Sequence, residues 1–560
     1  MKKNFIIGAL IACIFLIGFC LRFLYLDIPL WYDEACSWTS AINTFPSGIM
    51  NNLLNEDLQH TPLYFFLLHF WIKIFPQSEI SMRVLSLIFG FLSLPLIYIV
   101  SRKIFDKKIA IYSSAICSVS PLLVLFSTEV RMYSLVIFLV LLSINFLTDY
   151  QQKNQSSSLI KLTVTNIFIP YTFVGGIFYN FSLLLFYSIY LFKNKKENFK
   201  KFIIAESFEW IFLIPYFILI TYYASIRKTF IVTHEGSLHF SDIVDALRNF
   251  FGATVTPNVY WPSEGSYNIT FLFTILVIVP CVYFIYGYIK SLKNSDDFVK
   301  TLGRIFCLCF GLAIVFGMLK VSILTVRYII YILAPVIIIA VAGLFANLNK
   351  KHSQIFLLCF IFASLIFSIN NAKTIKINKE NAFKNPATEC TKLGFDYRDV
   401  VIMPFGSDAP YYFKDITMPV IFNADFHKIT RNPNGIYYDD SQHKILKTNK
   451  KYKFILDKIN ENNVFSRNFF KYFMENVYGK VENGRYAVLI MYGDDNSIIK
   501  PVEELRNNIK TEKDVKSKIL YTMFSKYMCD IVAILNYKFK FVQSFQKDNF
   551  TYYIYQKINK

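Results

Sequence analysis

The chain has 560 residues and a formal net charge of +20, and 54% of its residues are apolar while only 18% are charged. Soluble domains carry about a quarter charged residues, so this composition excludes an ordinary soluble enzyme, a disordered chain, a collagen and a small disulfide scaffold. An integral membrane protein remains.

Eleven apolar segments in the first 370 residues resemble membrane spans, which need about 20 mostly apolar residues. Short basic loops separate them, and they cover 4–25, 82–100, 109–128, 132–149, 159–178, 181–192, 202–223, 269–289, 302–319, 328–347 and 354–370. The pair 159–178 and 181–192 has the weakest pattern, because Pro170 interrupts the first segment and the second is short. Residues 62–76 are apolar but too short to cross, so we expect a helix at the membrane surface. The fold class predicted is a polytopic α-helical membrane protein with about 11 transmembrane helices.

The basic residues predict the orientation, because Lys and Arg accumulate in cytoplasmic loops. They cluster in every second loop, which places the N-terminus in the cytoplasm. The outer side then holds all residues after 370 and the loops 27–81, 129–131, 224–268 and 320–327. The first outer loop agrees, because it has five acidic residues and no Lys or Arg from Asp27 to Trp71. This topology explains the basic excess without a nucleic-acid or nucleotide partner.

Residues 371–560 have the composition of a soluble domain, which divides the chain into a membrane domain, 1–370, and an extracytoplasmic domain, 371–560. Alternating apolar segments predict strands at 400–404, 486–492 and 551–555, and amphipathic segments predict helices at 444–460, 497–510 and 515–534. We therefore expect a small α/β or α+β domain that binds the acceptor or supports a lid. Cys390 and Cys529 both face outside, so a disulfide and two free thiols are both open alternatives.

Two motifs in the first outer loop carry residues suited to chemistry. The acidic pair Asp33-Glu34 has apolar and aromatic neighbours, which raise the pKa of a carboxyl group and suit it to accept a proton. The alternative for this pair is a solvated loop or the acidic first turn of a helix. The second motif, His60-Thr61-Pro62-Leu63-Tyr64, begins the surface helix, where the histidine is alternatively a turn or cap residue.

A third motif, Glu129-Val130-Arg131-Met132-Tyr133, forms a tight turn between two predicted spans. Charged side chains at such a place are costly unless they have partners, and by default they indicate function. Arg83 and Arg327-Tyr328 lie at a similar predicted depth, and arginines suit a phosphate ligand. The structural alternatives are ion pairs of Arg131 with Glu129 and of Arg83 with Glu79.

The sequence indicates no organic cofactor and has no Gly-rich phosphate loop. His234, Glu235 and His239 in the outer loop 224–268 leave a divalent metal as an alternative, but their spacing is not that of a zinc-binding helix, and packing is the favoured reading. In the same loop, Trp261 is a candidate for stacking on a sugar.

In order and spacing, these motifs resemble the GT-C membrane glycosyltransferases. The resemblance covers about residues 1–350 and rests on Asp33-Glu34 in an acidic first loop, His60–Tyr64, Glu129–Tyr133 and Arg327-Tyr328 ahead of an apolar run. The most similar group that we identify is the bacterial part of the protein O-mannosyltransferase-like superfamily. It includes the aminoarabinose transferase that acts on lipid A and the lipopolysaccharide galacturonosyltransferases.

The resemblance implies a multi-pass enzyme of the bacterial inner membrane that moves a sugar from a polyprenyl-phosphate carrier to an extracytoplasmic lipid, glycan or protein. It implies that Asp33 is the base that removes the acceptor proton, and that Glu34 orients the acceptor or holds neighbouring helices. Attack opposite the phosphate leaving group would invert the anomeric carbon in one step.

For the donor phosphate we expect Arg131 first, then Arg327 and Arg83. We expect hydrogen-bonding or supporting roles for His60, Tyr133, Glu129, Tyr328 and Tyr64. Two alternatives from other classes remain, a transporter or flippase for a lipid-linked sugar and a non-catalytic scaffold of envelope assembly. A transporter predicts broken helices and charges near the bilayer midplane, whereas the charges identified above gather at one face.

Overall fold

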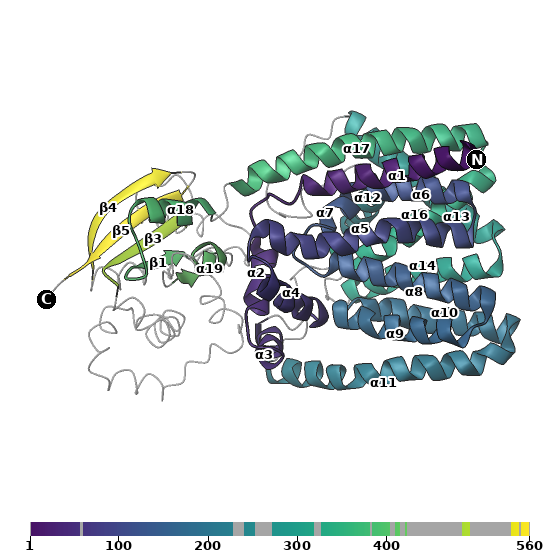
Figure 1. Cartoon of the computed structure of the whole chain (residues 1–560), viewed down its shortest axis with the longest axis horizontal. Helices are drawn as coiled ribbons and strands as arrows, with labels where there is room; N and C mark the ends of the chain where they lie inside the picture. Colours follow the sequence, from purple (N-terminus) through teal and green to yellow (C-terminus); the bar gives the residue numbers. More distant parts are fainter. Residues whose placement is uncertain are drawn as a thin grey trace. The chain divides into compact units, whose positions relative to one another are not determined.

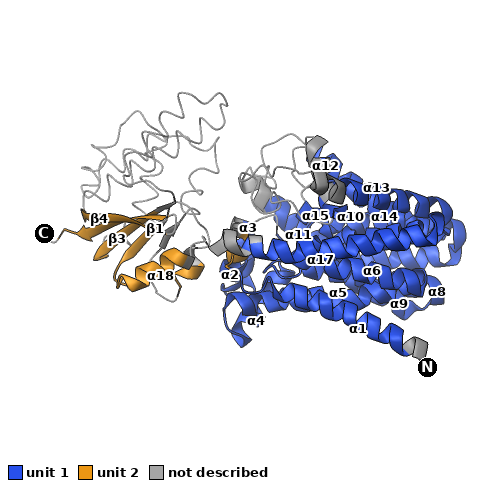
Figure 2. Ribbon diagram, turned by 90° about the horizontal axis from the view of Figure 1, so that it is seen from above, with its two compact units in different colours: residues 1–28, 37–377 blue, residues 29–36, 378–560 orange. Residues whose placement is uncertain are grey.

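The computed structural model describes residues 2–56, 60–227, 240–252, 271–318, 326–380, 384–403, 409–414, 420–422, 484–492, 539–547 and 550–558. Contacts divide the chain into two compact units, residues 1–28 with 37–377 and residues 29–36 with 378–560 (Figure 2). The sequence analysis places a single boundary after residue 370, whereas the contacts place it after Ile377 and also assign Pro29–Cys36 to the second unit.

The described elements up to residue 380 are all helices, and the long helices of the first unit run side by side in a bundle (Figure 1). Its elements are α1 (Lys2–Phe23), α2 (Tyr32–Ala41), α3 (Ser47–Glu56), α4 (Leu63–Ile74), α5 (Glu79–Ile104), α6 (Lys107–Val119), α7 (Pro121–Phe126), α8 (Tyr133–Lys153), α9 (Ser156–Thr172), α10 (Gly176–Asn194), α11 (Lys196–Arg227), α12 (Phe240–Phe251), α13 (Phe271–Asn294), α14 (Asp297–Met318), α15 (Val326–Ile329), η2 (Ile330–Ile332), α16 (Leu333–Asn347) and α17 (Lys350–Glu380).

Eight helical segments within the described residues have the length and hydropathy needed to cross a membrane. They coincide with eight of the eleven predicted spans and comprise α1, α5, α8, α10, α11, α14, α15 to α16, and α17. The other three predicted spans are also helical, as α6 followed by α7, as α9 and as α13. The short apolar helix predicted at 62–76 is confirmed as α4. The protein is therefore a multi-pass helical membrane protein.

Polar contacts tie the basic loops together at one end of the bundle. The Lys103 ammonium lies 2.7 Å from a carboxylate oxygen of Asp149, and Lys195 donates to the Gln151 carbonyl at 2.6 Å. These contacts join the ends of α5 and α8 to the turn before α11, so the loops that the sequence assigns to one side of the membrane meet in the fold.

The second unit contains a five-stranded mixed sheet in the order β2-β1-β3-β5-β4. Its strands are β1 (Val400–Met403), β2 (Val420–Phe422), β3 (Tyr486–Tyr492), β4 (Phe539–Lys547) and β5 (Phe550–Lys557). The pairs β1–β2 and β1–β3 are parallel, with Val401 opposite both Val420 and Val488, whereas β3–β5 and β4–β5 are antiparallel. The three predicted strands are confirmed as β1, β3 and β5, and the predicted helices at 444–460, 497–510 and 515–534 lie outside the described residues.

Two short helices, α18 (Lys384–Lys392) and α19 (Ala409–Tyr412), accompany the sheet. Cys390 on α18 is a free thiol in the core of this unit, where it packs with Val401, Val488 and Tyr552. Burial raises the pKa of this thiol to about 12, so it is an unreactive core residue. The disulfide alternative for Cys390 is therefore wrong in this structure, and Cys529 lies outside the described residues.

Candidate functional site

The candidate site is centred on Arg131, in the turn between α7 and α8. Its side chain is only 2% exposed, and its Nη2 lies 2.6 Å from Nε2 of His60. Its Nη1 donates to the Ser37 hydroxyl at 3.3 Å. A guanidinium can only donate, so Nε2 of His60 accepts, and the imidazole is neutral with its proton on Nδ1. Two separate sequence motifs therefore meet as one buried pair.

Hydrogen bonds from two neighbouring helices fix the backbone beneath Arg131. The Ser86 hydroxyl on α5 donates to the Arg131 carbonyl at 3.3 Å, and the Tyr64 hydroxyl on α4 lies 2.7 Å from the Ser86 hydroxyl. Tyr64 therefore reaches Arg131 through Ser86, and its supporting role stays a prediction. The α5 helix can approach this turn because it presents Gly90 there, and a Cβ at that position would lie 2.2 Å from Cβ of Ser127.

The residues around Arg131 form a buried turn. Glu129 is 3% exposed, and its backbone carbonyl accepts from the Arg131 amide at 2.7 Å. The guanidinium hydrogen bonds described above go to His60 and Ser37, and an ion pair of Arg131 with Glu129 stays an alternative. Tyr133 begins α8 and packs its ring edge-on against Phe126, with centroids 4.9 Å apart.

Arg327 and Tyr328 belong to an aromatic cluster that reaches the same turn. The Arg327 guanidinium lies 5.2 Å from the centroid of the Tyr328 ring. Tyr328 in turn stacks on Phe173 at 6.1 Å, and Phe173 contacts Tyr133 edge-on at 6.4 Å. The cluster links α15 to the start of α8, and it holds Arg327 by a cation–π contact.

Arg83 has a different position from the one expected of a phosphate ligand. Its side chain is 2% exposed, and its Nη1 donates to the backbone carbonyls of Leu26, at 2.9 Å, and of Ile28. Arg83 therefore holds the chain segment that follows α1. This arrangement favours a positioning role over the predicted phosphate contact.

Asp33 and Glu34 lie in the first turn of α2. Glu34 is fully buried, and its Oε2 accepts from the backbone amide of Trp31 at 3.2 Å. An acidic side chain that reaches back to the residue before the helix is half of a capping box, so Glu34 stabilises the start of α2. Asp33 is half-buried and lies one helical turn before Ser37 in the same helix. Both acids belong to the second unit, whereas Arg131, His60, Arg83 and Arg327 belong to the first, and a joint role for the two sets stays a prediction.

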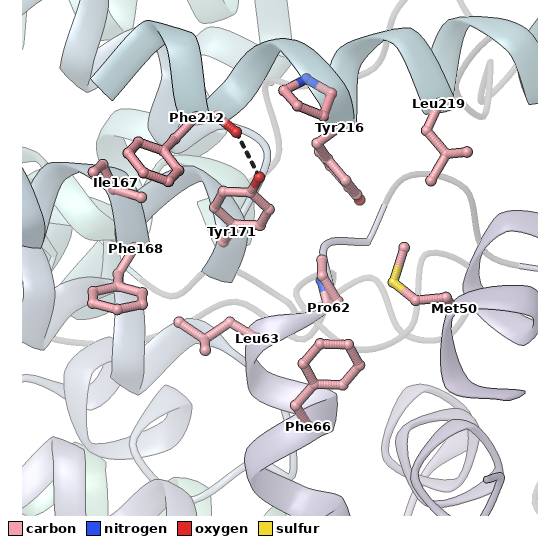
Figure 3. A pocket seen from close by; sticks show the side chains of 11 residues that line it. Met50, Pro62, Leu63, Phe66, Ile167, Phe168, Tyr171, Phe212, Tyr216 and Leu219 are labelled. Carbon is pink, nitrogen blue, oxygen red and sulfur yellow. Dashed lines mark hydrogen bonds between the residues drawn. The ribbon is translucent and has the colours of Figure 1, made fainter. Parts of the chain in front are cut away.

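An apolar pocket of about 470 Å³ lies in the first unit beside the start of α4 (Figure 3). Helices α3, α4, α9 and α11 contribute its lining, and most of the lining side chains are aliphatic or aromatic: Met50, Pro62, Leu63, Phe66, Ile167, Phe168, Tyr171, Phe212, Pro215, Tyr216 and Leu219. The Tyr216 hydroxyl donates to the backbone carbonyl of His60 at 3.2 Å. The pocket wall is therefore connected to the residue that holds Arg131.

Within the residues that the structure describes, no three His, Cys, Asp or Glu side chains are grouped closely enough to hold a metal ion. The metal alternative at His234, Glu235 and His239, and the stacking candidate Trp261, lie outside the described residues.

Comparison with known proteins identifies the fold. Residues 59–204 match the family model for dolichyl-phosphate-mannose-protein mannosyltransferase, a segment that contains His60, Tyr64, Arg83 and Arg131. The structure of the chain is similar to that of ArnT from Cupriavidus metallidurans bound to undecaprenyl phosphate, with a TM-score of 0.53 and 9% identity over 99% of this chain and 98% of that chain. The chain therefore has a GT-C-like fold.

A second GT-C structure, the Archaeoglobus fulgidus oligosaccharyltransferase in complex with Zn and sulfate, is similar with a TM-score of 0.50 and 11% identity over 97% of this chain and 72% of that chain. No curated protein matches the chain by sequence. The GT-C fold that the sequence motifs imply is confirmed.

The sequence motifs did not identify four contributors to this candidate site. Ser37 and Ser86 are serines in helical segments, Tyr216 lies within an apolar span, and the pocket is assembled from four helices. No local sequence motif marks these three residues or the pocket, because each acquires its role from the packing of the helices.

Proposed function

We propose that this protein is an inverting glycosyltransferase that moves a sugar from a polyprenyl-phosphate donor to an extracytoplasmic glycolipid, glycan or protein. The observation that carries the proposal is the buried Arg131–His60 pair, whose histidine is hydrogen bonded to the wall of an apolar pocket. A lipid phosphate needs both features, a fixed positive charge and an apolar groove. The ArnT structure that resembles this chain holds undecaprenyl phosphate.

Arg131 stabilises the negative charge that develops on the phosphate as the sugar leaves. A guanidinium that is already oriented in a site shielded from water needs no reorganisation during the reaction. It therefore lowers the activation barrier more than a mobile cation at the surface does. His60 and Ser37 occupy two of the guanidinium nitrogens, which leaves the group fixed in one direction. The prenyl chain enters the pocket between α4, α9 and α11.

Asp33 acts as the base. It accepts the proton of the acceptor hydroxyl or amine while that atom bonds to the anomeric carbon, and the bond from that carbon to the phosphate oxygen breaks with the electron pair leaving on the lipid phosphate. The single displacement inverts the configuration. Glu34 supports this role because its capping hydrogen bond holds the first turn of α2, where Asp33 lies.

The enzyme works at the outer face of a bacterial inner membrane, with the N-terminus in the cytoplasm and residues 371–560 outside. The support is the alternation of basic loops, of which those around Lys103 and Lys195 meet at one end of the bundle. The sheet of the second unit then faces the compartment of the acceptor, and we assign it to acceptor binding.

The test is transfer of a radiolabelled pentose or hexose from undecaprenyl phosphate to membrane acceptors by the purified full chain. We expect Asp33→Asn and Arg131→Ala to abolish transfer, whereas Asp27→Asn, at an exposed acid of the same loop, retains it. Unchanged transfer in the Asp33→Asn protein would contradict the mechanism. If no donor supports transfer but Arg131 is needed to move a lipid-linked sugar across vesicle membranes, the enzyme proposal fails in favour of a flippase.

A further inference from the structure

Two glutamates lie inside the membrane domain, away from the site described above. Glu206 and Glu209 are both on α11 and both are fully buried. They lie 10 and 13 residues after Lys196, which is about 15–20 Å along a helix that rises 1.5 Å per residue. The predicted span begins at residue 202, so the two glutamates lie about 6 and 10 Å inside a hydrocarbon core about 30 Å thick, in the third next to the basic loop. The motif residues alone suggest that the charges gather at one face of the protein. The two glutamates show that they do not.

Helices α9 and α10 supply polar partners to these carboxylates. The Asn180 amide on α10 donates to Oε1 of Glu209 and, at 2.8 Å, to the Asn166 carbonyl on α9. The Asn166 amide lies 3.5 Å from Oε1 of Glu206, and its Oδ1 accepts from Ser143 at 2.7 Å. The result is a polar cluster that joins α8, α9, α10 and α11, which lie side by side (Figure 1).

The cluster has an excess of hydrogen-bond acceptors. Oε2 of Glu206, Oε2 of Glu209 and Oδ1 of Asn180 are buried and have no hydrogen-bond partner. The identity of the Asn180 oxygen is fixed, because its nitrogen already donates to two acceptors.

The described residues supply no positive charge to offset the glutamates. No Lys, Arg or His side chain among them forms an ion pair with Glu206 or Glu209. The other titratable groups that act on the cluster are Tyr179 of α10, whose hydroxyl lies 2.9 Å from Ser143, and Cys309 of α14. Neither can become a cation. A buried carboxylate pair without a cation is strongly unfavourable, and unpartnered acceptors compound the cost.

We propose that Glu206, Glu209 and Asn180 form a binding site for a monovalent cation, Na⁺ or a proton, inside the helix bundle. Their unpartnered oxygens are the hard ligands that an alkali cation or a proton binds. The bound cation would offset the buried negative charge. The inference does not depend on the glycosyltransferase proposal.

The position of this cation site connects it to the apolar pocket. Ile167 and Phe168, which follow Asn166 in α9, line the pocket, as does Phe212, one turn after Glu209 in α11. Tyr171 donates to the Phe212 carbonyl at 2.7 Å across the same pair of helices (Figure 3). A bound cation would join α11 to α10, and the hydrogen bonds of Asn166 with Glu206 and Asn180 connect that junction to α9, the second helix of this pocket wall.

The first test is thermal stability of the full chain in detergent, with Na⁺ varied against choline at constant ionic strength and with pH varied in the absence of Na⁺. A ligand that binds only the folded state raises Tm with its concentration. We expect Tm of the wild type to rise either with Na⁺ or on acidification, and the Glu206→Gln/Glu209→Gln protein to lose that response. Glu197→Gln, at an exposed glutamate of α11, is the matched control. Equal responses in wild type and the double variant would overturn the proposal.

The second test keeps the native sequence, in case the double variant does not fold. A hydrophobic carbodiimide modifies protonated carboxyl groups within membranes, and peptide mass spectrometry locates the adduct. Modification at Glu206 or Glu209 that decreases with added Na⁺ supports a metal cation, and modification that decreases only with rising pH supports a proton. No modification, or modification that neither Na⁺ nor pH changes, as expected if the cluster holds a water molecule only, would contradict the site.

Discussion

Nε2 of His60 lies 2.6 Å from Nη2 of Arg131, and both side chains are almost completely buried. The two residues are 71 positions apart, so the fold and not the local sequence creates the pair. Because the guanidinium always donates, the histidine has the role of orienting a fixed positive charge. The pair therefore separates two functions, with Arg131 as the charge and His60 as the group that aims it.

This division predicts the effect of removing the imidazole. We expect His60→Ala to weaken binding of undecaprenyl phosphate by roughly 10- to 100-fold, the loss expected for one hydrogen bond to a charged group. His60→Gln, whose amide oxygen can accept from Arg131, should restore part of the affinity. Binding is measured on the purified protein by native mass spectrometry or scintillation proximity. The control is His69→Gln, at a buried histidine of α4 that contacts the Ala41 carbonyl. Equal affinity in the wild type and His60→Ala would remove His60 from the site.

The apolar pocket predicts a dependence on prenyl chain length. Leu63→Trp places a larger side chain at the pocket wall. We expect KM for a long-chain donor to rise at least several-fold, while KM for a two-isoprene donor stays nearly constant, because a short chain leaves most of the pocket empty. Phe70→Trp, at an exposed position of the same helix, is the control. An equal change for long and short donors would show that the chain binds elsewhere.

The membrane architecture was predictable from sequence because the bilayer imposes one dominant requirement. Each span must be apolar and satisfy its own backbone hydrogen bonds, so hydropathy alone located all eleven helical segments, including α9 despite Pro170. The second unit was predictable only in part. Strands β1, β3 and β5 have clear apolar patterns, whereas β2 has three residues and β4 is a mostly exposed edge strand with a register shift at Phe541/Gln543. Short and exposed strands have little alternation to detect.

The candidate site was predictable as a set of residue types but not as a set of contacts. Motif spacing identified His60, Tyr64 and Arg131, yet it gave Arg83 a ligand role although its guanidinium holds the backbone of Leu26 and Ile28. The intramembrane glutamates Glu206 and Glu209 were present in a predicted span and received no role. In each case the role depends on which helices pack against each other, and a single sequence does not show these contacts.

In the second unit, Asp396 predicts an acid-sensitive contact. Its carboxylate accepts hydrogen bonds from the side chain and backbone of Arg398, and Arg485 lies 3.3 Å away. These contacts, with that of the Arg398 side chain the largest, hold the pKa of Asp396 below its ordinary value. A carboxyl with a lowered folded-state pKa stabilises the fold above its unfolded pKa, about 4, and this stabilisation is lost as the pH falls through the folded value.

We therefore expect the second unit to loosen progressively below about pH 4. The measurement is the rate at which dithiodipyridine, which reacts with thiols in acid, modifies the buried Cys390 thiol, followed by peptide mass spectrometry. Asp396→Asn should modify faster than the wild type at pH 6 and show a smaller increase in acid. Asp297→Asn, at an exposed ion pair of α14, should behave as the wild type. The same acid response in Asp396→Asn and wild type would assign the sensitivity to other carboxyl groups.

The adjacent acids Asp33 and Glu34 predict opposite consequences of substitution. Glu34 is fully buried and caps α2, so Glu34→Ala should lower the free energy of unfolding by about 1 kcal/mol, the usual value of a helix cap, and reduce activity only through that loss. Glu34→Gln keeps an oxygen for the Trp31 amide and should preserve most of both. Asp33→Asn should leave Tm within about a degree of the wild type but remove sugar transfer, because an amide cannot accept the acceptor proton. Measuring Tm and kcat on the same three variants distinguishes the structural role of Glu34 from the catalytic role of Asp33. If Glu34→Gln is as inactive as Asp33→Asn at unchanged Tm, the carboxylate charge of Glu34 takes part in the reaction, and the cap does not account for its burial.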